Sequence, residues 1–191
     1  PPNKDFSPEK PLGKSKEIHI LKIQLGLTCN YSCEYCSQRF VPRADETSRK
    51  HVESFLEKID VLEFNEKKGL RIELWGGEPF LYWKTIVPLV DGIKQKFSHW
   101  KKKPEFSVIT NGSTLTEEMV DWIVENMTGG AVSHDGPGQP VRGPDPFEDE
   151  NQKKIILDLY KKMNGRFSFN SMINNQNMSR VDIHKWFVKL T

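Results

Sequence analysis

All three cysteines of this 191-residue chain lie within one short segment, at Cys29, Cys33 and Cys36. Thiolates ligate both iron–sulfur clusters and zinc, and a short loop can bring three of them to one metal centre. A four-iron cluster normally takes four cysteines, so three would leave one iron open to an external ligand. A closed zinc site would need a fourth ligand, such as a distant histidine. Spacing alone leaves both interpretations open, together with three unrelated buried thiols.

The composition narrows the class of protein. Hydrophobic residues make up 36% and charged residues 28% of the chain, as expected for a soluble globular domain. The net charge of +2 is too small to indicate a nucleic-acid partner. The sequence shows no apolar run of membrane-spanning length and no signal segment. An odd number of cysteines argues against a disulfide framework, so we expect a reducing, cytoplasmic location.

The hydrophobic pattern predicts five strands that alternate with five helices. Residues 1–16 are rich in proline and lysine and predict an extended N-terminal arm, followed by one domain at 17–191. The expected strands are 18–25, 70–75, 106–110, 131–133 and 166–173. The expected helices begin at Thr47 or Ser48 and near 86, 116, 148 and 181. This alternation predicts an α/β fold, with a parallel sheet curled into a partial barrel and helices outside.

Polar motifs follow each predicted strand. The cysteine loop comes after the first strand, and the later motifs are Gly76-Gly77-Glu78-Pro79, Thr110-Asn111-Gly112, Ser133-His134-Asp135-Gly136 and Asn174-Asn175. Because parallel strands end at the same edge of a sheet, we expect all of these motifs on one rim.

Taken together, these motifs resemble the signature of the radical S-adenosylmethionine (radical SAM) superfamily. The resemblance rests on Cys-x3-Cys-x2-Cys after the first strand, on the Gly-Gly-Glu-Pro motif and on their order along the chain. Ser133-x-Asp135-Gly136-Pro137 is similar to the peptide- and protein-modifying branch, which is sulfatase-maturase-like and of the SPASM type. The resemblance implies a partial (β/α)6 barrel with about five units present. The chain starts with Pro1 and not with Met, so we expect that it is trimmed or is part of a longer protein. Because no sixth unit is visible, we also expect that it is truncated at the C-terminus.

The resemblance also implies cofactors and an activity. Cys29, Cys33 and Cys36 would hold a [4Fe-4S] cluster, and SAM would bind the fourth iron. Reductive cleavage of SAM, fed by a flavodoxin- or ferredoxin-type electron donor, would give a 5′-deoxyadenosyl radical that abstracts hydrogen from a peptide or protein. Such an enzyme is an oxidoreductase of the peptide-modifying type. Two alternatives stay open: a small-molecule or nucleotide substrate, and a metal-stabilised binding module without catalysis.

Further residues are expected to contact SAM by the same resemblance. Tyr35 would lie against the adenine, Glu78 would accept a hydrogen bond from the ammonium group, and Ser133 would lie near the carboxylate or ribose. The remaining expected contacts are Gly76 and Gly77 through close backbone approach, Pro79 at the turn, Thr110, Asn111, Asp135 on the same rim as Ser133, and Asn174 at the ribose. Simple packing of Tyr35, an ordinary turn at Gly76–Pro79 and a turn role for Asn111 are the competing interpretations.

Two residues outside this set carry separate expectations. His134 stands where the family commonly has an aliphatic residue, and we expect it to be a packed or capping side chain rather than a catalytic one. Arg142 lies in the glycine- and proline-rich stretch 136–147, which predicts a stiff, irregular loop on the rim. Its side chain would either meet an acidic substrate group or lie on a surface loop.

Overall fold

The computed structural model describes residues 17–41 and 47–190. The predicted arm at 1–16 lies outside the described residues, as do 42–46 and 191. No helix in the described part of the chain is both long and apolar enough to cross a bilayer.

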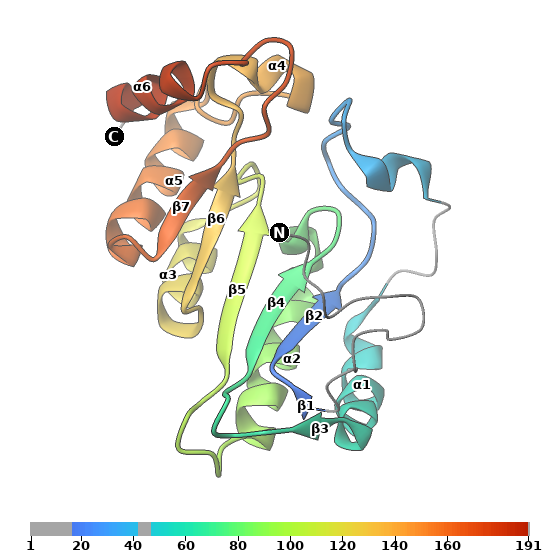
Figure 1. Ribbon diagram of the computed structural model, residues 1–191. Coiled ribbons are helices and arrows are strands. Elements are labelled where there is room, and N and C mark those ends of the chain that lie inside the picture. Colours follow the sequence, from blue (N-terminus) through green and yellow to red (C-terminus); the bar gives the residue numbers. More distant parts are fainter. Residues whose placement is uncertain (1–16, 42–46, 191) are drawn as a thin grey trace, which may run out of the picture.

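A five-stranded parallel sheet forms the centre of the domain, in the order β2-β4-β5-β6-β7 (Figure 1). Its strands are β2 Ile20–Gln24, β4 Arg71–Trp75, β5 Glu105–Thr110, β6 Gly129–Ser133 and β7 Phe167–Asn170. The main helices are α1 Val52–Lys58, α2 Trp83–Lys96, α3 Glu117–Asn126, α5 Glu150–Met163 and α6 Arg180–Leu190. The predicted fold class and its five strand–helix units are thereby confirmed. Within the described residues the sheet stays open and does not close into a barrel.

The first predicted strand is divided, because it changes its pairing partner. Glu17–Ile18 (β1) pairs with Glu63–Phe64 (β3) in a separate two-stranded sheet, and a strand at 63–64 was not predicted. From His19 onward the same chain pairs with β4, since the His19 carbonyl accepts a hydrogen bond from Arg71 N at 2.9 Å. An apolar pattern predicts that a segment is extended, but the choice of neighbour depends on the packing of the whole sheet.

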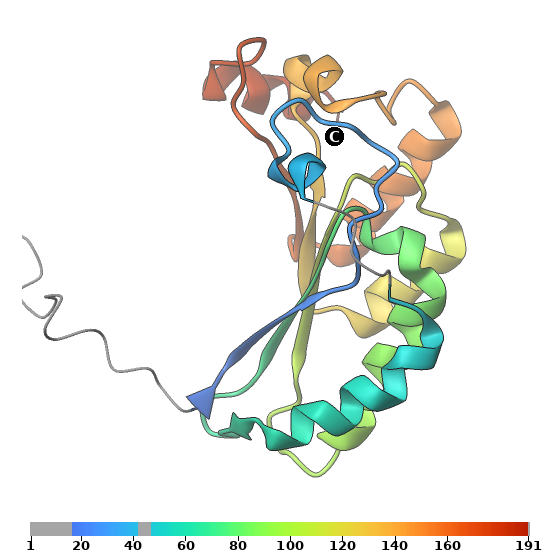
Figure 2. The same ribbon diagram turned by 90° about the vertical axis from the view of Figure 1, so that its right-hand side faces the viewer.

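Helices α1, α2, α3 and α5 cover one face of the sheet (Figure 2). Alternation along each strand explains this, because successive side chains point to opposite faces. In β4, Ile72 and Leu74 are buried against the helices, whereas Trp75 points the other way and is 46% exposed. The core on the helix side is continuous, and its fully buried members include Phe106, Ile86, Ile93, Ile123, Ile156 and Leu159. The opposite face stays accessible beneath the rim.

All strand ends with polar motifs lie at the same end of the sheet, where the cysteine loop and the short helix α4 (Gln139–Arg142) also lie (Figure 1). The fold therefore assembles the predicted rim from five separate stretches of sequence.

Candidate functional site

A cavity of about 580 Å³ opens at this rim, a volume typical of small-molecule and cofactor sites. It is lined by all three cysteines and by most of the residues expected to bind a cofactor: Tyr35, Gly76, Gly77, Glu78, Thr110, Asn111 and Ser133. Three expected residues, Pro79, Asp135 and Asn174, lie outside this lining. Residues far apart in sequence thus meet at one hollow.

The three thiols are free and differ in exposure. Cys29 is exposed, Cys33 is buried and Cys36 is intermediate. Burial raises the pKa of both Cys29 and Cys33. A metal would have to displace those protons, because the thiolate is the ligand form. Within the described residues no three Cys, His, Asp or Glu side chains are yet close enough to hold an ion, so the loop gathers the thiols without drawing them together. Three soft donors on one loop beside one cavity fit the ligand needs of an iron–sulfur cluster.

The two glycines of the second motif let the end of β4 press against the start of the cysteine loop. Gly77 N donates to Gly26 O at 3.0 Å, and Glu78 N donates to Thr28 O at 3.0 Å. A Cβ at Gly77 would lie 2.3 Å from Thr28 O, and Gly76 has a φ of +151°. The close approach seen here is therefore that of the cysteine-loop backbone.

Changing Gly77 to alanine is expected to destabilise the fold by about 3 kcal/mol, because the colliding atoms are backbone and cannot move aside. Urea unfolding of the variant measures this loss. Gly92→Ala is the matched control, since its added Cβ would meet first the end of the flexible Leu56 side chain, and we expect less than about 1 kcal/mol there. Equal stability of the two variants would contradict this account of the motif.

Glu78 is a buried hub that joins the ends of β4 and β5. Its carboxylate accepts hydrogen bonds from Phe80 N at 3.1 Å, from Thr110 Oγ1 at 2.7 Å and from Asn111 N at 2.7 Å. Burial raises the pKa of Glu78, while these three donors oppose the rise. Pro79 follows at the first position of the 3-10 helix Pro79–Tyr82, which Glu78 caps. Glu78 is also among the residues that line the cavity. Its expected hydrogen bond with the ammonium group of SAM stays a prediction.

Asn111 links the third motif to the cysteine loop. Its side-chain amide donates to Asn30 Oδ1 at 2.9 Å, and Asn30 in turn donates to Ser113 Oγ at 2.7 Å. The side-chain oxygen Oδ1 of Asn111 accepts a hydrogen bond from Ser113 N at 2.9 Å, as in the turn that was the competing interpretation. Asn111 therefore has a turn role while it also lines the cavity.

Ser133 and Asp135 do not share one environment. Ser133 lines the cavity, whereas Asp135 is fully buried behind it. The Asp135 carboxylate accepts hydrogen bonds from Tyr35 Oη, Arg142 Nη2, Met172 N and Asn174 Nδ2. Asn174 also donates to Gly138 O, so both residues connect the β6 motif to its surroundings.

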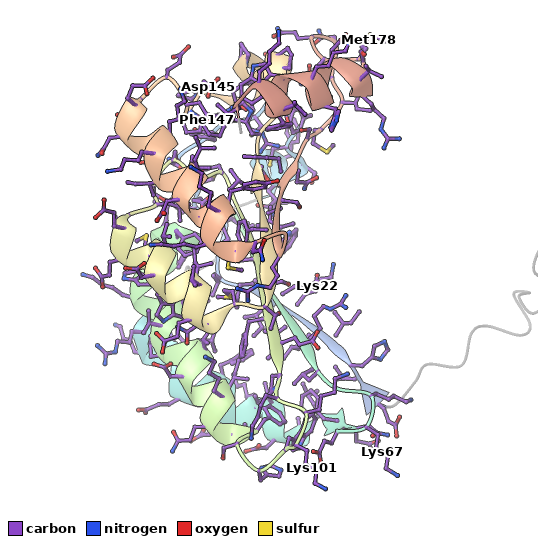
Figure 3. The ribbon with its side chains drawn as sticks, turned by 90° about the vertical axis from the view of Figure 1, so that its left-hand side faces the viewer. Lys22, Lys67, Lys101, Asp145, Phe147 and Met178 are labelled. Atoms are coloured by element: carbon purple, nitrogen blue, oxygen red, sulfur yellow. The ribbon has the colours of Figure 1, made fainter. Side chains whose placement is uncertain are left out.

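His134 is a packed side chain, as expected. It is 0% exposed and stacks on Trp186 with ring centroids 4.6 Å apart. Its Nδ1 accepts a hydrogen bond from Gly136 N at 3.0 Å, so the proton lies on Nε2, which donates to Asp145 Oδ1 at 2.9 Å. Figure 3 shows Asp145 and Phe147 at the end of the molecule where α6 lies, opposite Lys67 and Lys101.

Because burial lowers the pKa of His134, we expect it to weaken the fold in acid. The unfolded chain gains this proton below about pH 6.5 while the folded chain resists it, so stability falls by up to about 1.4 kcal/mol per pH unit from there downward. Urea unfolding at pH 7.5 and 5.5 should show a smaller loss for His134→Gln than for the natural chain. The exposed His184→Gln variant should behave like the natural chain. The same loss of stability between pH 7.5 and 5.5 in all three proteins would show that the acid effect does not come from His134.

The prediction for residues 136–147 was partly wrong. The stretch begins with two short helical segments, Gly136–Gly138 and Gln139–Arg142, rather than an irregular loop. Proline near the start of each segment fixes a helical φ, which explains why a proline-rich stretch can turn helically. Arg142 is buried against Asp135 and does not lie on a surface loop.

Several residues that line the cavity were not predicted. They are chiefly Trp75, Ile109, Met172, Asn170 and Tyr31. Leu74 of β4 and Val108 of β5 lie opposite each other in the sheet. The residues that follow them, Trp75 and Ile109, lie on the open face, and each is 46% exposed. Strand alternation could have identified these two, since each neighbours a buried core position. Met172 and Tyr31 come from loops, where no periodicity indicates direction.

Comparison with known proteins agrees with this geometry. The profile of the Radical SAM superfamily matches residues 23–184. The radical SAM cyclopropyl synthase TigE of Paramaledivibacter caminithermalis is 26% identical over 176 residues, covering 83% of this chain and 36% of TigE. The serine-type anaerobic sulfatase-maturating enzyme of Bacteroides thetaiotaomicron is 26% identical over 196 residues, covering 92% of this chain and 44% of that enzyme. The chain thus spans less than half the length of these relatives.

Solved structures share the fold. anSMEcpe with bound AdoMet and the Kp18Cys peptide gives a TM-score of 0.72 at 23% identity, covering 89% of this chain and 48% of anSMEcpe. Streptococcus suis SuiB bound to its precursor peptide SuiA gives 0.63 at 14% identity, covering 92% of this chain and 37% of SuiB. The superfamily uses a [4Fe-4S] cluster and SAM as cofactors. Since the family profile spans most of the chain, this protein belongs to the radical SAM superfamily.

Proposed function

We propose that this chain is the cofactor-binding core of a radical SAM enzyme that acts on a peptide or protein side chain. The observation that carries the proposal is the single rim cavity lined by Cys29, Cys33 and Cys36 together with residues of the Gly-Gly-Glu-Pro, Thr-Asn-Gly and Ser-x-Asp-Gly motifs. When bound, the cluster would supply one electron for cleavage of SAM, and SAM would supply the 5′-deoxyadenosyl radical that abstracts hydrogen from the substrate. The chain itself supplies ligands, position and exclusion of water.

Each part of the cavity has a proposed role. The three cysteines hold the cluster, with Cys33 shielded from solvent and Cys29 more open to it. Glu78 is fixed by three donors, so its carboxylate is already oriented before it meets an ammonium group. Tyr35, Gly76, Gly77, Thr110, Asn111 and Ser133 line the space for the rest of SAM. Pro79, Asp135 and Asn174 support these residues from behind.

A peptide or protein substrate is supported by the relatives. The sulfatase-maturating enzyme is similar along 92% of this chain, and anSMEcpe and SuiB were solved with bound peptides. Trp75, Ile109 and Met172 add exposed apolar area to the cavity wall, where a side chain of a peptide could pack. Free thiols favour a reducing compartment such as the cytoplasm, with a flavodoxin- or ferredoxin-type donor for the electron.

A small-molecule or nucleotide substrate is the second candidate. The S-adenosylmethionine-dependent nucleotide dehydratase of a Thermoplasmatales archaeon is 32% identical, but over only 120 residues, or 58% of this chain. Because this match is shorter than that to the sulfatase-maturating enzyme, we favour the peptide or protein substrate. The third candidate, a metal-stabilised module without catalysis, keeps the fold and the thiols but not the reaction.

Anaerobic reconstitution of the natural chain with iron, sulfide, dithionite and SAM tests the proposal. We expect brown absorbance, about four irons per chain and release of 5′-deoxyadenosine. A colourless protein that holds zinc and leaves SAM intact would support the third candidate instead. Once cleavage is found, transfer of deuterium from a labelled peptide or a labelled nucleotide into 5′-deoxyadenosine separates the first two candidates.

A further inference from the structure

The cysteine loop is held from one side by a segment more than a hundred residues away in sequence. Glu34 N donates to Val141 O at 3.1 Å, and Tyr31 Oη donates to Pro144 O at 2.8 Å. Gly143 lies directly under the Tyr31 ring, because a Cβ there would come within 3.2 Å of it. Two positions of the loop, one on either side of Cys33, are therefore docked against the stretch 141–144.

A third position of the loop, Tyr35, contacts two charged side chains. Tyr35 lies between Cys33 and Cys36, and its hydroxyl donates to Asp135 Oδ2. Arg142 donates to the other oxygen of the same carboxylate at 3.2 Å. The guanidinium carbon of Arg142 also lies 5.6 Å from the centroid of the Tyr35 ring, within range of a cation–π interaction. Arg142 thus contacts Tyr35 both directly and through Asp135.

Asp135 is itself held in place by burial and by several hydrogen bonds. It is completely buried, its second pair of partners is Met172 N and Asn174 Nδ2, and its backbone carbonyl accepts from Asn177 Nδ2 at 2.8 Å. A buried carboxylate with donors on both oxygens has few other positions available. The geometry of Tyr35 therefore follows from that of Asp135 and Arg142.

Arg142 also faces the cavity. Its side chain is 10% exposed and lines the hollow that contains the three thiols. Its Nε is buried and has no hydrogen-bond partner among the described residues. A buried cation beside a metal site acts over several ångströms, because little water screens it. The charge of this residue consequently reaches whatever occupies the cavity.

We propose that Arg142 is a positioning residue that, with Asp135, clamps Tyr35 and keeps the cysteine loop docked with Cys33 buried, while its charge favours the reduced cluster. The effect of the Arg142 charge on the cluster rests on the proposed function, whereas the clamp on Tyr35 concerns the chain without any cofactor. A three-thiolate cluster gains negative charge on reduction, so a nearby fixed cation raises its potential.

Labelling of thiols in the cofactor-free protein tests the clamp. Cys33 is buried, and its modification by maleimide, followed by peptide mass spectrometry, reports opening of the loop. We expect Arg142→Met to speed labelling of Cys33 by about tenfold, because it removes both an ion pair and a cation–π contact, and Tyr35→Phe by about fivefold, because it removes one hydrogen bond to the Asp135 carboxylate. Arg142→Lys should stay near the natural rate, and the exposed Arg180→Met is the matched control. Natural rates in both Arg142→Met and Tyr35→Phe would overturn the clamp. Should Arg142→Met fail to fold, Tyr35→Phe decides the result, and a natural rate in that variant would overturn the clamp.

The reconstituted protein tests the charge. Removing the cation in Arg142→Met should lower the ratio of reduced to oxidised cluster at fixed potential by about tenfold, or 59 mV for one electron. Removing the anion in Asp135→Asn should shift the midpoint potential the opposite way, a reversal that simple loosening of the loop would not produce. Shifts of the same sign, or none, would overturn the electrostatic role. If no cluster forms even in the natural chain, the proposed function fails while the labelling result still stands.

Discussion

Replacement of Cys33 with alanine is expected to remove the cluster and SAM cleavage together. Cys33 is the middle thiol of the loop and the most buried of the three, so no solvent ligand can take its place easily. Even residues that only support a metal ligand lower affinity or activity by 10- to 100-fold when changed, so loss of a ligand itself should lower cleavage by at least about 100-fold. Iron content, visible absorbance and 5′-deoxyadenosine measured on the same preparation check this.

Ser32→Ala is the matched control for Cys33→Ala, because Ser32 is the exposed neighbour on the same loop. We expect this variant to take up iron as the natural chain does. Thermal unfolding of both cofactor-free variants shows whether the fold survives. SAM cleavage that persists in Cys33→Ala, at natural iron content, would contradict the ligand assignment.

Removal of the Glu78 carboxylate should have the largest effect on stability of any change at the rim. In Glu78→Ala, Phe80 N, the Thr110 hydroxyl and Asn111 N lose their acceptor in a buried place. Each unsatisfied buried donor costs about 1–3 kcal/mol, so we expect a loss of about 4 kcal/mol after partial relaxation. The expected hydrogen bond between Glu78 and the ammonium group of SAM predicts weaker SAM binding. The buried contacts predict that stability falls as well. Urea unfolding, iron content and SAM binding together measure both effects.

Two further variants sharpen the Glu78 experiment. Glu78→Gln keeps the shape and one acceptor oxygen but turns an NH₂ group toward donors, so we expect a loss of about 2 kcal/mol. Glu125→Ala removes an exposed glutamate on α3 and should change stability by less than about 0.5 kcal/mol. A Glu78→Ala protein as stable as Glu125→Ala would show that the three hydrogen bonds contribute nothing.

Much of the fold could be predicted from the chain because it depends on local pattern. Alternating apolar residues such as Ile72 and Leu74 predict strands, and the motifs at their ends predict a shared rim. Where a strand departs from prediction, the difference lies in which neighbouring strand it pairs with. The strand expected at 18–25 divides at His19 because two different strands lie beside it.

For the site, the sequence by itself determined which groups are present: three thiols at close spacing, glycines where backbones meet, and acids at strand ends. Residue type and spacing are enough for this, because parallel strands bring their carboxyl ends to one edge. Only the tertiary structure decided what those groups do to one another. Asp135 and Arg142 lie seven residues apart, yet their shared contact with Tyr35, a hundred residues earlier, exists only once β6 and the cysteine loop are packed together. Whether Arg142 contacts solvent or the Asp135 carboxylate depends on its burial, and burial is decided only when the chain folds.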